Sequence, residues 1–472
     1  MTARAVEVYP GGYPRRWRAL GVLCLCLSIV VIDNTILAVA FPSIESGLHT
    51  NEAGLQWIGS AYGLVLAGLL LPLAVVGDRR GRKGLLMIGL VIFGVASAAA
   101  AFATTAVWLA IARGAMGVGG ACTMPSTLSV LGNIFPEQER GKAISVWSGV
   151  AGLMTAVGPV IGGLLLARFW WGSVFLVNVP IVIVALVLVA RWVPRSHDPA
   201  SPPVDRWSAL LWWGALSAII LAIVEGPERG WGSPIVLGAA GGGLALLYAF
   251  AKREDRSLEP LIEDETRRDP RLRWGAAAVS ALFFGVMGTQ FVLTQWIQGP
   301  EHHSALATGL YFVPTAITSV LFALLNPKMA ARWGHGLVAG LGLAVTSLGA
   351  LVAAVAVVAE SLPGVVVAGT LIGMGIGIAA VSSVELIMSS ARPERAGSAS
   401  GVNETLVEAS GALGIAVLGS VLVESGSYAW PLPVVTVVAA GTALGMSLSF
   451  RKKSRFKKRA RASRRSSASS TS

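Results

Sequence analysis

The sequence predicts an all-α polytopic membrane protein that crosses the bilayer about 14 times. Hydrophobic residues make up 54% of the 472 residues and charged residues only 13%, about half the charged fraction of a soluble domain. Apolar stretches long enough to cross about 30 Å of hydrocarbon recur along the whole chain, separated by short polar segments. Backbone groups in lipid must be hydrogen-bonded within their own segment, so stretches of this length are helices rather than barrel strands.

Each span is placed where an apolar stretch follows a polar or turn-forming segment. The first span is expected to be retained and not cleaved as a signal peptide, because it is too long and many further spans follow it. The predicted starts lie near Ala19, Leu55, Gly84, Val107, Gly141, Ser173, Ser208, Pro234, Trp274, Leu306, Gly336, Pro363, Gly397 and Ala429.

The placement of lysine and arginine orients the chain in the membrane. With both termini cytoplasmic, Arg168 and Arg229 fall in outer loops and Arg113 falls inside a span, so the other 34 of the 37 basic residues face the cytoplasm. We therefore expect a plasma-membrane protein with both ends in the cytoplasm. The net charge of +12 follows from this topology and does not indicate nucleic-acid binding. The basic C-terminal tail is expected to lie on anionic membrane lipids and otherwise to be disordered.

Two charged, proline-containing segments, Arg191–Trp207 and Lys252–Arg273, divide the spans into six, two and six. A weak internal repeat supports a duplication, because the loops after the second and tenth spans align when Gly81 is matched with Gly334. The predicted parts are a cytoplasmic N-terminal segment (1–18), an N-terminal six-helix bundle (19–193), a linker and two inserted helices with a cytoplasmic loop (194–273), a C-terminal six-helix bundle (274–450) and a basic cytoplasmic tail (451–472).

Ionisable residues interrupt the apolar stretches at five positions: Asp33, Arg113, Glu385, Glu404 and Glu408. A charge at the bilayer centre costs about 3 kcal/mol on insertion scales, so such residues usually have a function. Asp33 and Arg113 carry opposite charges and are expected to pair. Glu404 and Glu408 are four residues apart on one helix face and cannot easily both be ionised in a poorly hydrated cavity, which suits proton coupling. The alternative is that Glu404 is simply hydrated near the cytoplasmic mouth. Four carboxylates against one arginine favour cations as substrates.

The loop after the second span has the order Asp-Arg-x-Gly-Arg, formed by Asp78, Arg79, Gly81 and Arg82. This loop resembles the signature between the second and third helices of the major facilitator superfamily. The chain as a whole resembles the fourteen-span drug:proton antiporter branch of that family, although Ala74 stands where the signature has a glycine. The resemblance implies two six-helix bundles with two inserted helices, and it implies that these four loop residues act as a conformational switch.

The fifth span contains Gly158, Pro159, Gly162 and Gly163, an order similar to the antiporter motif of the same branch. Small residues four apart permit close helix contact, and a proline bends the helix. Met154 stands where the fuller motif has a glycine. The resemblance implies antiport rather than symport.

The resemblance and the embedded charges together predict a site for proton coupling and substrate. Asn34 follows the aspartate of the first span, and Asn403 precedes the acidic pair of the thirteenth. Aromatic faces such as that of Trp296 can attract cations, although a place in the interfacial belt is the alternative for a tryptophan. The predicted site residues are Asp33, Asn34, Arg113, Gln290, Gln295, Trp296, Glu385, Asn403, Glu404 and Glu408.

No pattern in the sequence indicates an enzyme, a cofactor or a metal site. Cys24, Cys26 and Cys122 fall inside spans without metal-ligand or disulfide spacing. The glycine-rich stretch 373–380 lies in an apolar span and does not follow a soluble strand, so it is not a nucleotide loop. The paired loop histidines 302 and 303 are expected to be solvated.

The predicted function is proton-coupled antiport, which exports hydrophobic, cationic drugs or toxic compounds from the cytoplasm. Its partners would be protons and small lipophilic molecules. One alternative is a dedicated exporter of a single natural product or antibiotic made by the same organism. Another is a non-transporting membrane sensor on the same fold, which the presence of Asp33, Arg113 and Asp78 disfavours.

Overall fold

The structure is a computed structural model of the chain and describes residues 12–195, 206–256, 269–390 and 396–468. The described residues form helices and connecting turns, with no strand among them. In these ranges 13 helices are long and apolar enough to cross a membrane, and a fourteenth contributes the shorter apolar stretch Val157–Leu166. The predicted all-α membrane fold is therefore confirmed.

The helices fall into three sets. The N-terminal group is α1 (Arg16–Leu48), α2 (Glu52–Arg80), α3 (Arg82–Ala101), α4 (Ala106–Ile134), α5 (Glu137–Leu166), α6 (Ser173–Leu176) and α7 (Asn178–Trp192). The inserted pair is α8 (Arg206–Arg229) and α9 (Pro234–Glu254). The C-terminal group is α11 (Pro270–Gln298), α12 (Ala305–Trp333), α13 (His335–Val358), α14 (Leu362–Met388), α15 (Ala396–Ser425) and α16 (Pro431–Ala468).

Capping residues explain why the helices begin close to their predicted starts. The side chains of Asn51, Thr105, Ser304 and Ser361 each accept a hydrogen bond from the backbone N–H three residues later. These bonds satisfy amide groups that a helix start would otherwise leave unpaired. Each span begins within four residues of its predicted start.

The turns at Gly81 and Gly334 support the predicted duplication. Gly81 ends α2 and begins α3 with φ of +118°, and Gly334 ends α12 and begins α13 with φ of +81°. Residues with a side chain rarely adopt such angles, so both turns need glycine. The two residues that align in the sequence repeat therefore have the same structural task in each group.

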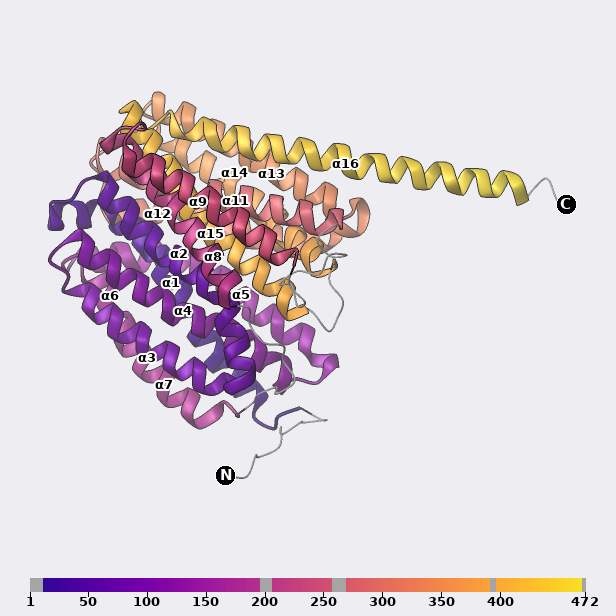
Figure 1. The fold of residues 1–472 in the computed structure, drawn as a ribbon, viewed down its shortest axis with the longest axis horizontal. Coiled ribbons are helices and arrows are strands. Elements are labelled where there is room, and N and C mark those ends of the chain that lie inside the picture. Colours follow the sequence, from indigo (N-terminus) through magenta and orange to yellow (C-terminus); the bar gives the residue numbers. More distant parts are fainter. Residues whose placement is uncertain (1–11, 196–205, 257–268, 391–395, 469–472) are drawn as a thin grey trace.

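Two elements differ from the prediction. The sixth span is interrupted at Val177, between the single turn of α6 and α7, which places Asn178 at the start of α7. The basic tail was predicted to be disordered from Arg451, but α16 continues as a helix to Ala468. Alanine, lysine and arginine are strong helix formers, which explains the extension. Figure 1 shows the distal part of α16 projecting away from the other helices.

Each group is built from its own helix pairs. In the N-terminal group α4 packs on α2 and α3, and α1 packs on α5. In the C-terminal group α14 packs on α12 and α13, and α11 packs on α15. In Figure 1 the indigo to magenta helices of the first group and the orange to yellow helices of the second occupy opposite sides of the molecule.

The two groups meet first where α5 packs on α12. A Cβ atom at Gly163 would meet the backbone of Ala305 and Leu306, and a Cβ atom at Gly309 would meet the backbone of Pro159. Backbone cannot swing aside as a flexible side chain can. The close approach of α5 and α12 therefore depends on glycine on both helices.

The second contact between the groups is between α2 and α15, and the inserted helix α8 covers it. Ser60 of α2 donates a hydrogen bond to the carbonyl of Ala412 at 3.3 Å, and Ser420 of α15 donates to the carbonyl of Ile223 in α8 at 2.7 Å. The shared apolar cluster consists of Ala53, Leu64 and Ala67 from α2, Leu216, Ile220 and Val224 from α8, and Ala409, Ala412 and Ala416 from α15. The inserted helix α8 thus makes these two contacts between the groups unequal.

Among the described residues, hydrogen bonds between the groups concentrate at the end where α1 stops and α2 starts, here called the Glu52 end. The Gln295 amide donates to the Glu52 carboxylate at 2.8 Å, and the Gln298 amide donates to the carbonyl of Val39 at 2.9 Å. Ser420 also donates to the side-chain oxygen of Gln56 at 3.3 Å. The structure is therefore fastened at the Glu52 end, opposite the turn at Gly81.

Gly163→Ala is expected to separate α5 from α12 and to loosen the Glu52 end. The added methyl meets backbone, so the expected loss of stability is about 1–3 kcal/mol despite the better helix propensity of alanine. Thermal unfolding of the purified protein measures the loss, and maleimide labelling of a cysteine at position 298 measures opening. Gly149→Ala is the matched control, because its Cβ would meet open space on the same helix. Equal stability and labelling in both variants would contradict the proposed role of the contact.

Candidate functional site

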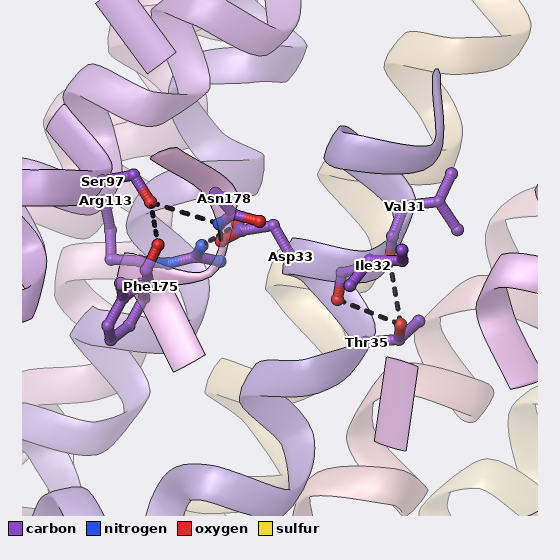
Figure 2. Close-up of polar contacts among 8 residues, drawn as sticks. All are labelled: Val31, Ile32, Asp33, Thr35, Ser97, Arg113, Phe175 and Asn178. Atoms are coloured by element: carbon purple, nitrogen blue, oxygen red, sulfur yellow. Dashed lines mark hydrogen bonds and ion pairs between the residues drawn. The ribbon is translucent and has the colours of Figure 1, made fainter. Parts of the chain in front are cut away.

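A buried ion pair joins α1 to α4 in the middle of the N-terminal group. The Asp33 carboxylate accepts a hydrogen bond from the Arg113 guanidinium, and both side chains are 0% exposed. Figure 2 shows the two side chains pointing toward each other from their helices. The pairing predicted from the sequence is present.

Neighbouring side chains fix the other carboxylate oxygen of Asp33. The Asn178 amide donates to it at 2.9 Å and also to the Ser97 hydroxyl at 3.1 Å. Ser97 in turn donates to the carbonyl of Phe175 at 2.8 Å. The chain of bonds, drawn in Figure 2, ties α1 to α3 and to the break between α6 and α7. These bonds help offset the cost of burying the carboxylate.

Arg113 is also covered by an aromatic ring. Its guanidinium carbon lies 4.6 Å from the centroid of the Tyr62 ring of α2. A Cβ at Gly117 would meet the backbone of Tyr62, and one at Gly120 would lie 2.7 Å from its hydroxyl oxygen. The two glycines of α4 therefore make room for Tyr62, which can attract the guanidinium through its π face.

Glu408 lies across from this cluster on α15. Its carboxylate oxygen would be 3.5 Å from a Cβ placed at Gly63, the residue after Tyr62. Glu408 interacts electrostatically with Arg113, Tyr62 and Glu404. Glu404, half-buried one turn away, accepts a hydrogen bond from the Asn403 amide at 3.3 Å. The acidic pair of the C-terminal group thus comes close to the ion pair of the N-terminal group.

Several predicted site residues lie elsewhere. Glu385 is exposed, three residues before the end of α14. Gln295 is hydrogen-bonded to Glu52, and Trp296 is only 3% exposed within the apolar core, so both lie at the Glu52 end in the last turn of α11. Asn34 and Gln290 are half-buried, and no hydrogen bond of either side chain is described. The structure therefore brings together Asp33, Arg113, Asn403, Glu404 and Glu408 and places Gln295, Trp296 and Glu385 away from them.

The residues predicted as a conformational switch are only partly described. The side chains of Asp78 and Arg79 lie outside the described part of the structure, while Gly81 forms the turn with positive φ. The lysine of the same loop, Lys83, donates to the carbonyls of Ala190 at 2.8 Å and Val193 at 2.7 Å. This lysine was not predicted as a site residue, and it fastens the start of α3 to the end of α7.

The glycines of the predicted antiporter motif contact helices on two sides. A Cβ at Gly158 would meet Thr35, and one at Gly162 would meet Ile36 and Val39, all on α1. Gly163 and Pro159 face α12, as described above. The motif therefore places α5 between the helix that carries Asp33 and the C-terminal group.

Three residues that surround the ion pair were not predicted from the sequence. Ser97 and Tyr62 are single polar groups in apolar helices, where their side chains resemble ordinary packing residues. Asn178 is a single amide side chain in the apolar sixth span, a signal that could have placed it in the site. Among the described residues no group of three or more histidine, cysteine, aspartate or glutamate side chains could hold a metal ion.

The fold and the buried charge network are those of a secondary transporter. The family model of the Major Facilitator Superfamily matches residues 23–415. The chain belongs to the Major Facilitator Superfamily.

Several curated relatives align with this chain over most of the length of both proteins. The multidrug efflux pump LfrA of Mycolicibacterium smegmatis is 35% identical over 86% of this chain and 81% of its own. The methyl viologen resistance protein SmvA of Salmonella typhimurium is 32% identical over 89% of this chain and 85% of its own. The tetracenomycin C resistance and export protein of Streptomyces glaucescens is 31% identical over 88% of this chain and 78% of its own.

Solved structures support the fold alone, because their identity is low. A POT family transporter in complex with a thioalcohol-conjugated peptide has a TM-score of 0.71 at 16% identity, covering 92% of this chain and 96% of that chain. The human organic anion transporter MFSD10 has a TM-score of 0.65 at 14% identity, covering 92% of this chain and 100% of that chain.

The ion pair predicts a specific pattern of stability. Asp33→Ala should lower the free energy of unfolding by about 3–5 kcal/mol, because it leaves Arg113 buried without its counter-charge. The double variant Asp33→Ala/Arg113→Leu should recover much of that loss, since no charge is then buried. Thermal unfolding in detergent measures both, with Glu385→Ala as the control on an exposed carboxylate. An Asp33→Ala protein as stable as the wild type would show that the pair is not needed for folding.

Proposed function

We propose that this transporter is a proton-coupled antiporter that exports hydrophobic cationic compounds from the cytoplasm and that it performs no catalysis. The observation that carries the proposal is the fully buried Asp33–Arg113 pair, with the half-buried Glu408 facing it from the other group. The names of the relatives, multidrug efflux and methyl viologen resistance, support export of toxic compounds.

The geometry suggests how proton and substrate compete. In this structure the charge of Asp33 is compensated by Arg113, so the uncompensated carboxyl groups of the site are Glu404 and Glu408, which can both be ionised only when a cation lies beside them. A cation in a poorly hydrated cavity needs such a counter-charge. Asp33 is therefore assigned to proton coupling, and the two glutamates to binding the cation.

The same contacts suggest how the protein alternates between a state open to the cytoplasm and a state open to the outside. A proton on Asp33 removes the charge that holds Arg113, which changes the packing of α1 on α4. Because α5 lies between α1 and α12, this change reaches the contact between the two groups. Asp78 and Arg79 are proposed as the conformational switch at the opposite end, near Gly81.

The membrane topology proposed here follows from the placement of lysine and arginine along the chain. The two six-helix bundles are proposed to span residues 19–193 and 274–450, with both termini in the cytoplasm. The distal part of α16, from Arg451, is proposed to lie on anionic lipids of the plasma membrane.

A dedicated exporter of one natural product is the second candidate. The tetracenomycin C resistance and export protein and the puromycin resistance protein of Streptomyces alboniger, 33% identical over 87% of this chain, favour it. A non-transporting sensor would not need both a buried ion pair and a facing acidic pair. Uptake assays with single antibiotics and with a panel of cations separate the two exporters.

Asp33→Asn should abolish proton-driven efflux, because it removes the titrating charge with little change of shape. The purified variant in liposomes, with an imposed pH gradient and ethidium as substrate, measures this directly. Glu385→Gln is the matched control and should transport as the wild type does, since Glu385 is exposed at the end of α14. Gradient-driven transport by Asp33→Asn at the wild-type rate would overturn the proposed function.

Glu408→Gln should weaken export of divalent cations more than that of monovalent cations. A dication needs two counter-charges in a poorly hydrated site, whereas a monocation can rely on the remaining glutamate. Glu404→Gln should show the same trend more weakly. Resistance assays with matched mono- and bis-quaternary ammonium compounds test the order. Equal losses for both compounds would assign Glu408 to proton coupling or packing.

A further inference from the structure

The hydroxyl of Tyr62 is buried without a hydrogen-bond partner among the described residues. The side chain is 0% exposed and lies between α2 and α4. Leaving a buried hydroxyl unpaired is costly, so a partner that forms in another state of the protein is a natural explanation. Packing alone would be served equally by phenylalanine.

Arg113 has unused donors in the same place. Its Nε and one terminal nitrogen have no partner in the described structure, while the other terminal nitrogen holds Asp33. The Tyr62 ring covers the guanidinium at 4.6 Å. The hydroxyl and the spare N–H groups are therefore parts of one incompletely bonded cluster.

The charges that face this cluster come from three helices. Asp33 comes from α1, Arg113 from α4 and Glu408 from α15, and each interacts electrostatically with Tyr62. Glu404 lies one turn beyond Glu408 on α15. Two other helices that pack on α2 carry charges at its ends. The acidic residues of α8 lie near the Glu52 end, where Glu225 accepts a hydrogen bond from Trp57. The charges of α3 lie in its first turn, near Gly81.

We propose that Tyr62 is a positioning residue that lets Arg113 change its partner from Asp33 to Glu408, with the tyrosine hydroxyl bridging Arg113 and Glu408. When Asp33 gains a proton, Arg113 loses its counter-charge and donates to the Tyr62 oxygen. The tyrosine keeps its own proton and donates it in a hydrogen bond to the Glu408 carboxylate. No covalent bond is made or broken at Tyr62.

The consequence is a direct exchange of proton for cation. Once Arg113 is paired with Glu408 through the hydroxyl, Glu408 has less negative charge to offer a cationic substrate. Protonation of Asp33 in one group thereby displaces the substrate from Glu408 in the other. The inference rests on the proton-coupled antiport proposed above, and it names the residue that connects the two acidic sites.

Binding of ethidium to the purified protein as a function of pH tests the proposal. The wild type should bind about 10-fold more weakly at a pH where Asp33 is protonated than where it is ionised. Tyr62→Phe should remove most of this difference by binding more tightly at the low pH, with unchanged affinity at the high pH. A purely structural role would change affinity at both. Tyr428→Phe, which removes a tyrosine hydroxyl in the 426–430 segment near the Glu52 end, should behave as the wild type.

A second variant links the effect to Glu408. In a Glu408→Gln background, Tyr62→Phe should have no further effect on the pH dependence of binding. An additive effect, or wild-type pH dependence in Tyr62→Phe, would overturn the role of the hydroxyl. If Asp33→Asn abolishes proton-driven efflux while Tyr62→Phe is normal, only this inference fails. If Asp33→Asn still transports, the proposed antiport itself fails.

Discussion

The buried pair of Asp33 and Arg113 is the constraint on which the N-terminal group depends. Removing two charges from water is costly, and the cost is offset only when the geometry is good and the remaining polar atoms are bonded. Asn178 of α7, itself bonded to Ser97 of α3, supplies such a bond to the carboxylate, while two nitrogens of Arg113 stay without a partner in the described structure. Helices α1, α3, α4 and α7 therefore meet around one carboxylate, and a change in its charge alters the packing of all four.

The position of α5 extends this constraint to the rest of the molecule. One face of α5, with Gly158 and Gly162, packs on Thr35, Ile36 and Val39 of α1, and the next residue, Gly163, packs on α12. Glycines at these contacts bring the helix axes close, so a small shift of α1 cannot be absorbed by side-chain rotation. The glycine motif would thus transmit the effect of the proposed protonation of Asp33 from the N-terminal group to the C-terminal group.

Much of the fold could be predicted from the sequence because apolar length and capping residues determine where membrane helices begin. The Asp33–Arg113 pair was also predictable, since opposite charges at membrane depth have few other partners. The supporting residues were not. Tyr62 and Ser97 reach the ion pair only through neighbours distant in sequence, and nothing in the sequence indicates that the Tyr62 hydroxyl is buried without a partner among the described residues. The exposure of Glu385 was also not predictable, because its apolar sequence context does not reveal that its position on α14 is exposed.

The inserted helix α8 gives the two contacts between the groups different tasks. At the contact of α5 with α12, backbones touch directly. At the contact of α2 with α15, α8 adds hydrogen bonds from Asn51 and Trp57 of α2 to its acidic residues, and Ser420 of α15 reaches only a backbone carbonyl of α8. Charge-assisted bonds are the stronger kind. We therefore expect α8 to remain with α2 when the groups part at the Glu52 end, so that its apolar face separates from α15. Glu408 lies on α15, so the carboxylate proposed to bind the cation is carried by a helix whose packing would change when the groups part.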